Sequence, residues 1–310
     1  MKQENTKIIN IIIKNNNIDQ RIDNFILSKF QITSKNQLYK KIRIGNIKIN
    51  EKKILPHYRL ALGDNISIQN IQLKKKQSLY INKRIKEKLL SCILYEDKHL
   101  IIINKPSGIP VHGGSGIAYG IIELFRIIKN SCTYLELIHR LDKDTSGILM
   151  MCKNKTSLKK IQQQFKEKKV KKKYIALLHG KMIPNKQIIS QPLIKNQLPN
   201  EKKKVIIHTH GKPSTTIFKE KYFFKHTTLA IIIPKTGRTH QIRVHAAYIG
   251  NPILFDKLYG NTNLDDKIHT KHKKKKILLH AQSIIFYHPI NNKQYFIKAP
   301  IKNRFKKYMK

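Results

Sequence analysis

The sequence HRLDKDTSGILMM, residues 139–151, contains a polar run whose spacing could bind a metal ion. Asp142, Asp144 and the Ser-Gly pair that follows read D-x-D-x-S-G, which is how a calcium-binding loop begins. Such a loop needs a bidentate Glu at its twelfth position, and that position is Lys153. A cation does not ligate a cation, and the apolar residues after the glycine are typical of a strand. The pattern therefore indicates a turn that presents carboxylates, with no metal.

A second polar run, in residues 234–253, is rich in hydrogen-bond donors. The sequence PKTGRTHQIRVHAAYIGNPI brings two guanidinium groups, two imidazoles and an amide close together. Such donors suit phosphate groups and the edge of a uracil base. An exposed strand without a binding role is the alternative interpretation. No G-x-x-x-x-G-K-[ST] loop occurs, and HGGSGIAYG matches neither G-x-S-x-G nor a dinucleotide fingerprint.

The elements that must position these residues are mostly short strands. From residue 91 on, apolar segments are broken by Gly and Pro: SCILYED, LIIINKP, YLELIHR, GILMMCK, KYIALLHG and TLAIIIPK. The segment SLKKIQQQFKEKK has the clearest helical spacing. The sequence therefore predicts an α+β fold in which residues 91–310 form a domain with a large mixed, mostly antiparallel sheet and peripheral helices.

A smaller α/β unit is expected at residues 18–78. Two helical patterns, RIDNFILSKF and SKNQLYKKIRIG, precede two strand patterns, NIKINEKKI and DNISIQ. Residues 1–17 are then an N-terminal segment, and residues 79–90 a basic linker that can be helical near its end. The basic side chains suit an RNA-binding surface; a small domain with solvated lysines is the alternative. Residues 269–276, HTKHKKKK, fit a solvated loop and an RNA contact equally well.

The composition favours a polyanionic partner. The 310 residues include 63 Lys and Arg against 18 Asp and Glu, a formal net charge of +45. Ile, Asn and Lys are enriched together, which indicates that nucleotide bias of the genome contributes to the Lys excess. Three isolated cysteines fit a reducing cytosol. No apolar run approaches ~20 residues and no signal-peptide pattern is found, so a cytoplasmic protein is expected.

Several blocks resemble one enzyme family. The segment IHRLDKDTSGILMMCKN closely resembles the signature of the RluA family of pseudouridine synthases, which isomerise uridine in RNA. Blocks similar to that family follow in its order: INKPSGIPVHGG, KKYIAL, KTGRTHQIRVHAAYIGNPILFDKLYG and LLHAQSIIFYHPINNKQYFIKAP. The unit at 18–78 resembles the S4 RNA-binding domain, so the likeness spans residues 18–305. VHGGSGIAYGIIE and GKPSTTIF most resemble the RluC branch, which acts on large-subunit ribosomal RNA in bacteria.

The resemblance implies roles for three residues at the reacting base. Asp142 would be the catalytic carboxylate, held on a loop between two strands. Arg243 would form a bidentate ion pair with Asp142 and keep it ionised. Tyr174 would stack on the target uracil and assist removal of the proton at C5. Whether Asp142 attacks the sugar or the base, or removes a C2′ proton, stays open.

The resemblance also implies a set of RNA contacts. The target uridine must be flipped out of RNA structure, and Arg140 would fill the vacated space. Arg238, Thr239, His240 and Gln241 are expected to bind RNA or the uridine. The partner would be 23S ribosomal RNA or a large-subunit precursor, bound by a monomer without cofactor, metal or membrane.

Two other classes of function fit part of the pattern. A non-catalytic RNA-binding protein needs only the S4-like unit and the charge, but it does not explain an Asp beside Arg243. A magnesium-dependent RNA hydrolase could use Asp142 and Asp144, but it lacks further carboxylates to complete a metal site.

Overall fold

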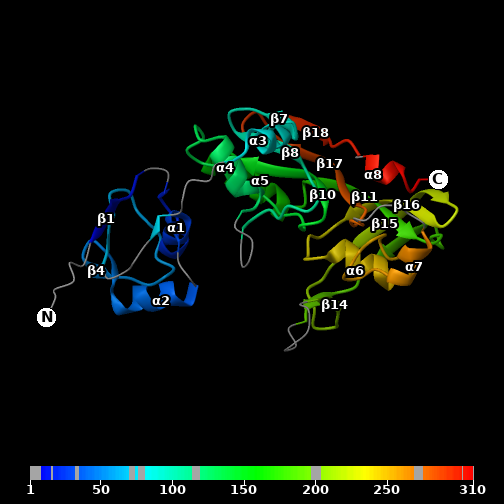
Figure 1. The fold of residues 1–310 in the computed structure, drawn as a ribbon, viewed down its shortest axis with the longest axis horizontal. Helices are drawn as coiled ribbons and strands as arrows, with labels where there is room; N and C mark the ends of the chain where they lie inside the picture. Colours follow the sequence, from blue (N-terminus) through cyan, green and yellow to red (C-terminus); the bar gives the residue numbers. More distant parts are fainter. Residues whose placement is uncertain are drawn as a thin grey trace. The chain divides into compact units, whose positions relative to one another are not determined.

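The chain folds into two compact units, residues 1–80 and 81–310 (Figure 1). The computed structural model describes residues 8–14, 17–31, 35–69, 74–75, 81–113, 119–196, 204–268, 275–301 and 303–309. Within these ranges no helix is long and apolar enough to span a membrane. Most of the segment 269–276, which fits a loop and an RNA contact equally well by sequence, lies outside them.

The first unit is built from two helices and small antiparallel sheets. Its elements are β1 (Ile9–Ile12), α1 (Ile22–Lys29), β2 (Phe30–Gln31), α2 (Lys35–Ile44), β3 (Ile47–Ile49), β4 (Lys52–Lys53), β5 (Asn65–Ile68) and β6 (Lys74–Lys75). The larger sheet has the order β1-β5-β3-β4, and β2 pairs with β6. Buried residues of both helices and of this sheet share one core, so the predicted helices and strands form a folded unit.

Two predicted boundaries of this unit are wrong. The prediction puts residues 1–17 outside the unit, but β1 pairs with β5 along its full length and forms an edge of the sheet. It also puts a basic linker at 79–90, helical near its end; the helix is present as α3 (Lys83–Leu90), but its Leu89 is buried in a core of the second unit, so α3 belongs to that unit. The alternation of apolar residues in β1 covers only four residues and does not stand out from the polar residues around it.

The second unit contains the large sheet. Besides α3, its elements are β7 (Ile93–Glu96), β8 (Leu100–Lys105), α4 (Ile121–Ile128), β9 (Glu136–Leu137), β10 (Ser146–Cys152), α5 (Lys155–Lys166), β11 (Lys171–His179), β12 (Lys186–Ile189), β13 (Leu193–Lys195), β14 (Val205–Ile207), β15 (Thr216–Phe224), β16 (Thr227–Pro234), α6 (Gln241–Tyr248), α7 (Thr262–Lys267), β17 (Leu279–Tyr287), β18 (Gln294–Lys298) and α8 (Asn303–Lys306). The predicted strands and the helix at α5 are confirmed, except that only Glu136–Leu137 of YLELIHR is a strand.

The sheet is mixed and mostly antiparallel, as predicted. Its ten strands follow the order β12-β15-β16-β11-β17-β10-β8-β7, with β18 added to β17 and β9 added to β10. One pairing is parallel: β10 meets β17 at Ser146–His280 and Gly147–Ala281. This parallel junction joins two antiparallel halves of the sheet, and the strand after the D-x-D-x-S-G turn forms one side of it.

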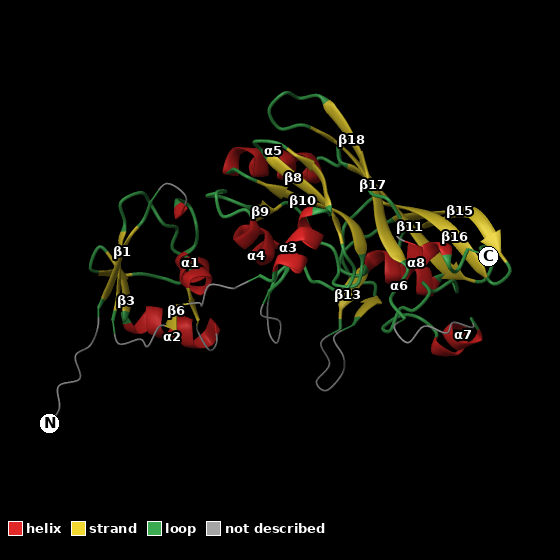
Figure 2. Ribbon diagram, turned by 45° about the horizontal axis from the view of Figure 1, so that its top comes forward, coloured by secondary structure: helices red, strands yellow, loops and turns green. Residues whose placement is uncertain are grey.

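Both faces of the sheet are covered. Alternate residues of β8 and β10 enter two different cores, one with α4 and the other with α5. Figure 2 shows these helices on opposite sides of the two strands. Strands buried on both faces read as continuous apolar runs, which explains LIIIN and GILMMC. In the other half, α6 packs on one face of β11 and β16, and α8 belongs to the core of the opposite face.

Gly147 ends the turn at the parallel junction. Its φ is +112°, a conformation that residues with a Cβ rarely adopt. A Cβ built on it would overlap the backbone of Ala281 on β17. The glycine of the D-x-D-x-S-G pattern is therefore required by the close approach of two strands, and not by a metal.

Gly147→Ala should destabilise the second unit. The positive φ alone costs roughly 1–2 kcal/mol for an L-residue, and the overlap with Ala281 adds to this. Gly250 is a matched control, because its φ is +74° but a Cβ added there would have nothing within 4 Å. Urea denaturation should show a larger loss of unfolding free energy for Gly147→Ala than for Gly250→Ala. Equal losses would mean that the strand junction tolerates a side chain.

Candidate active site in the sheet junction

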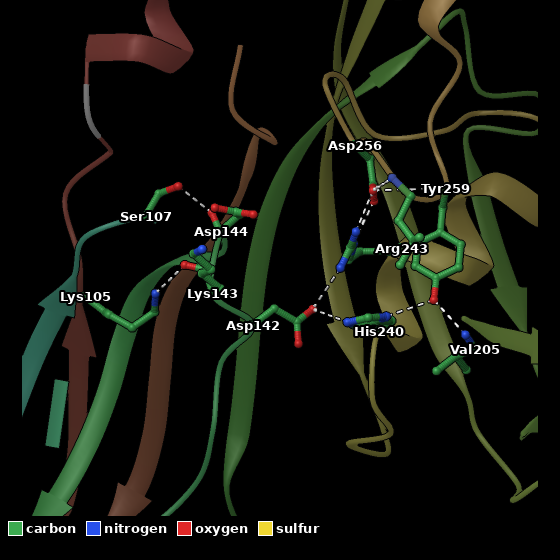
Figure 3. Close-up of polar contacts among 11 residues, drawn as sticks. Lys105, Ser107, Asp142, Lys143, Asp144, Val205, His240, Arg243, Asp256 and Tyr259 are labelled. Carbon is green, nitrogen blue, oxygen red and sulfur yellow. Dashed lines mark hydrogen bonds and ion pairs between the residues drawn. The ribbon is translucent and has the colours of Figure 1, made fainter. Parts of the chain in front are cut away.

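Asp142 lies on the loop between β9 and β10, as predicted. A lysine holds this loop by its backbone: Lys105, at the end of β8, is fully buried and donates from Nζ to the carbonyl of Lys143 at 3.0 Å. The same ammonium donates to the carbonyls of Pro106 and Ile109 at 3.0 and 2.8 Å. Lys105 thus ties the Asp142 loop to the segment after β8 (Figure 3).

Arg243, in the first half of α6, faces Asp142. Its Nη1 lies 3.6 Å from Oδ2 of Asp142, whose side chain is 24% exposed (Figure 3). Its other nitrogens make the shorter contacts: Nε donates to Asp256 Oδ2 at 2.7 Å and Nη2 donates to Oδ1 at 2.6 Å. Asp256 is buried and also accepts from the backbone N–H groups of Leu258 and Tyr259.

The prediction of a bidentate pair between Arg243 and Asp142 is wrong. The planar guanidinium fork is occupied by Asp256, and Asp142 receives only the remaining edge. Burial lowers the pKa of Arg243, but the hydrogen bonds and charge of Asp256, with the charge of Asp142, raise it overall. Arg243 is therefore a permanent cation with a fixed direction, and Asp142 keeps lone pairs for a substrate.

His240 also faces Asp142, with Nε2 at 3.9 Å from Oδ2. Its φ of +53° places it in the left-handed region just before α6. Burial lowers the pKa of His240 and outweighs the opposing effect of Asp142, while Arg243 lowers it further. The ring is therefore neutral near pH 7, unlike the arginine beside it.

Tyr259 orients this neutral imidazole. Its hydroxyl oxygen accepts the backbone N–H of Val205 at 2.8 Å and lies 2.8 Å from His240 Nδ1. Because the oxygen already accepts from Val205, we assign the O–H as donor to Nδ1, which leaves the proton of His240 on Nε2, facing Asp142. The Tyr259 ring also lies under the guanidinium of Arg243, 5.0 Å from centroid to Cζ. One tyrosine thereby positions both neighbours of Asp142.

Asp142, His240 and Arg243 line a cavity of about 250 Å³ together with Tyr174 on β11. Tyr174 sits where the two halves of the sheet meet, since it pairs with Ile232 of β16 and Ala281 of β17. Burial, and then the charge of Asp142, raise the pKa of its phenol. The hydroxyl is therefore protonated at neutral pH. A protonated phenol is better suited to stack on the uracil ring than to accept a proton from it.

The predicted RNA contacts divide into two groups. Arg140, Arg238, Thr239 and His240 line the cavity, and the two arginines are exposed. Gln241 also lines the cavity, but its buried amide donates to the Thr215 carbonyl and Thr216 Oγ1, and its oxygen accepts from Thr236 Oγ1 and the Arg238 N–H. Its polar atoms are therefore paired within the fold, and its contact with RNA stays a prediction.

The donors of a metal site are not assembled in the part of the chain that the structure describes. No group of three His, Cys, Asp or Glu side chains there could hold an ion. Asp144, the second candidate metal ligand, is exposed, and its carbonyl accepts from Ser107 Oγ at 2.6 Å. What the cavity offers is one accessible carboxylate among fixed cations and a phenol.

Comparison with known proteins gives the family. Residues 99–248 match the family model described as RNA pseudouridylate synthase. The chain is 49% identical to ribosomal large subunit pseudouridine synthase C of Buchnera aphidicola subsp. Schizaphis graminum over 310 residues, 100% of this chain and 99% of that protein. It is 37% identical to the protein of that name from Yersinia pestis over 308 residues, 99% and 96% of the two chains.

The chain belongs to the RNA pseudouridylate synthase family. It is accordingly an RNA-modifying isomerase. Two solved human structures share the fold of about two thirds or more of the chain. RNA pseudouridylate synthase domain containing 4 has a TM-score of 0.59 at 23% identity, covering 72% of this chain and 93% of its own. Domain containing 1 has a TM-score of 0.55 at 25% identity, covering 67% and 82%.

Sequence reasoning missed three residues of the site: Lys105, Asp256 and Tyr259. Each lies inside one of the family-like blocks, in INKPSG or FDKLYG, but none has a local signature of function. One signal was present: in a chain with only 18 acidic residues, an Asp in an apolar stretch such as ILFDKLYG is unusual and needs a buried partner.

Tyr259→Phe should lower the rate of isomerisation with little change in KM. The ring under Arg243 remains, but His240 loses its partner and the Val205 N–H loses its acceptor. We expect roughly a tenfold lower kcat, and a loss of roughly 1–3 kcal/mol of stability from the unpaired N–H. Tyr248→Phe, at an exposed position of α6, is the control and should behave like the wild type. Unchanged kcat in Tyr259→Phe would remove Tyr259 from the positioning of the site.

Proposed function

We propose that this enzyme converts specific uridines of 23S ribosomal RNA to pseudouridine, with Asp142 as its catalytic carboxylate. The observation that carries the proposal is the partly exposed Asp142, aimed into a cavity and faced by Arg243, which Asp256 fixes from behind. The ribosomal substrate is supported by relatives named ribosomal large subunit pseudouridine synthase C that match nearly the whole chain. Such RNA lies in the cytoplasm of bacteria, where we place the enzyme.

The reaction breaks the N1–C1′ bond of uridine, turns the base and joins C5 to C1′; C5 loses its proton and N1 gains one. A carboxylate can start it by attacking the sugar or the base, or by removing a C2′ proton. Arg243 stabilises charge at Asp142 throughout without blocking both its oxygens. Tyr174 provides a protonated aromatic surface for the detached uracil. No redox change occurs, so the reaction needs no redox cofactor. We propose that the enzyme acts without a cofactor or metal, and that it is a monomer.

The flipped-out base requires groups at the cavity entrance. Arg140 adjoins Leu141 and Asp142 in the sequence and lines the cavity, so its guanidinium is suited to occupy the space that the uridine leaves in the RNA. Arg238 and Thr239 lie on the turn before α6 and are suited to contact the RNA backbone. Opening RNA structure costs roughly a few kcal/mol, which these contacts must offset.

Asp142→Asn should abolish isomerisation while leaving RNA affinity nearly unchanged. The amide keeps the shape but cannot act as nucleophile or base, so a loss of at least about a thousandfold is expected. The measurement is tritium release from C5-labelled large-subunit rRNA under single-turnover conditions in EDTA. Asp144→Asn is the matched control, since this carboxylate belongs to the same loop but is exposed and has no part in the proposed chemistry.

Each rival function gives a different result in the same assay. A magnesium-dependent hydrolase would break phosphodiester bonds and leave the tritium on C5, and a non-catalytic RNA-binding protein would break no bond, so neither would release tritium. An Asp142→Asn turnover within tenfold of the wild type would contradict the assignment of Asp142.

Removal of residues 1–80 should weaken RNA binding without abolishing turnover. This unit carries 16 Lys and Arg against five Asp and Glu, a net +11, and none of the residues that line the cavity. We propose that it is an S4-like RNA anchor. For each phosphate that the shortened enzyme no longer binds, the salt slope of log K should fall by roughly 0.7–0.9. Binding titrations at several salt concentrations, with turnover at saturating RNA, measure both effects.

A circular-dichroism melt is the control that residues 81–310 remain folded. A folded truncated enzyme that binds rRNA as tightly as the full chain, with the same salt slope, would contradict the anchor role.

A further inference from the structure

Lys172 is a cation in the cavity wall that the proposed chemistry does not use. It lies on β11 two residues before Tyr174, and because side chains alternate along a strand the two share a face. Both line the cavity with Asp142. Lys171 and Lys173, its neighbours, are exposed, whereas Lys172 is partly buried.

The groups found around the Lys172 ammonium are aromatic. Its Nζ lies 5.7 Å from the centroid of the Phe165 ring, and Phe165 in turn contacts the ring of His139. Burial, followed by the charge of Lys172, lowers the pKa of His139 to about 3, so that ring is neutral. Burial also lowers the pKa of Lys172 itself. Among the described residues, no carboxylate lies within 4.0 Å of this ammonium.

The approach to the ammonium is open on one side. A Cβ added to Gly237 would lie 3.7 Å from Nζ, so the turn before α6 passes beside Lys172 without a side chain of its own. Arg238 follows in that turn and donates from Nε to the Pro213 carbonyl, which directs it along the rim. A ligand in the cavity therefore meets the ammonium directly.

We propose that Lys172 forms a phosphate-binding subsite inside the active-site cavity, which takes a backbone phosphate flanking the target uridine. The inference rests on the proposed function. A partly desolvated cation beside aromatic rings gains favourable electrostatic energy when a ligand brings an anion to it. RNA carries one phosphate at each linkage. Lys172 lines the same cavity as Asp142, so a uridine held at Asp142 places its own phosphates in the part of the RNA that is next to Lys172.

A phosphate contact at Lys172 should affect a different step of the reaction from the phosphate contacts of the arginines at the cavity rim. Rim arginines meet phosphates in water, whereas Lys172 meets one only after the nucleotide has entered. Its contact therefore favours the flipped-out state over the encounter complex. Loss of Lys172 should act on the single-turnover rate at saturating RNA more than on affinity for long RNA.

The test compares Lys172→Met with Lys173→Met in the full-length enzyme. The substrates are synthetic fragments that together cover the uridines of 23S ribosomal RNA, and the variants are compared on a fragment that the wild type converts. Lys172→Met should lose about ten- to a hundredfold in single-turnover rate, the range for a hydrogen bond to a charged group. Lys173→Met, on the opposite face of the strand, should stay within about twofold. Absence of turnover by the wild type would contradict the proposed function, whereas equal rates of the two variants would overturn only the subsite.

Methylphosphonate substitution identifies the ligand. Neutralising the linkages around the uridine one at a time should reveal one position at which the wild type slows but Lys172→Met does not slow further. At every linkage, the rate reductions caused by Lys172→Met and by the methylphosphonate could instead multiply. In that case Lys172 contacts no phosphate and the subsite is wrong.

Thermal melting separates a binding role from a structural one. An unpaired, partly buried charge disfavours the free enzyme, so Lys172→Met should melt at the same or a higher temperature than the wild type. A lower melting temperature for Lys172→Met than for Lys173→Met would mean that Lys172 serves the packing against Phe165, and would overturn the subsite.

Discussion

The site depends on the ion pair between Arg243 and Asp256. Asp256 is nearly inaccessible and accepts four hydrogen bonds, two from the guanidinium and two from backbone N–H groups. A buried carboxylate this well satisfied does not move, and it fixes the plane of Arg243. The remaining edge of that plane points at Asp142. Asp142 thus sits in a positive field without being held by two short bonds, which would occupy the lone pairs that its chemistry requires.

The two sides of the site come from different halves of the sheet. Asp142 belongs to the half with β8 and β10, where Lys105 ties down its loop. Arg243 and His240 belong to α6 and the turn before it, and α6 packs on β11 and β16. The halves meet at β17, by a parallel pairing to β10 and an antiparallel pairing to β11. Changes at this junction, such as a side chain at position 147, therefore alter the distance between carboxylate and guanidinium as well as stability.

The fold class, most strands and the loop that carries Asp142 could be predicted from the sequence, because these depend on local patterns. Continuous apolar runs identify strands that are buried on both faces, and the D-x-D-x-S-G turn identifies a loop with a required glycine.

The partners of Arg243 could not be predicted from such local patterns. Asp256 is 13 residues along the chain from Arg243 and reaches it only because the chain turns after α6. The same turn brings Tyr259 to His240, and neither contact has a periodic signal. Gln241 shows what residue type alone does not indicate: an amide in GRTHQIR could read a base, but at the first residue of α6 it donates to Thr215 and Thr216.

Two lysines at the site show how position decides the use of a charge. A net charge of +45 does not distinguish a functional cation from a compositional one, but the partners of each ammonium do. Lys105 is fully buried and donates to three carbonyls, so its charge is satisfied by the fold and holds the Asp142 loop. Lys172 is desolvated beside the rings of Phe165 and His139, neither of which can neutralise it. Removing a charge from water without a partner costs free energy in the free enzyme. That cost is offset only when an anion binds to the ammonium. The surroundings of each ammonium therefore decide its use: a satisfied one holds the fold, and an unbalanced one is suited to bind an anion.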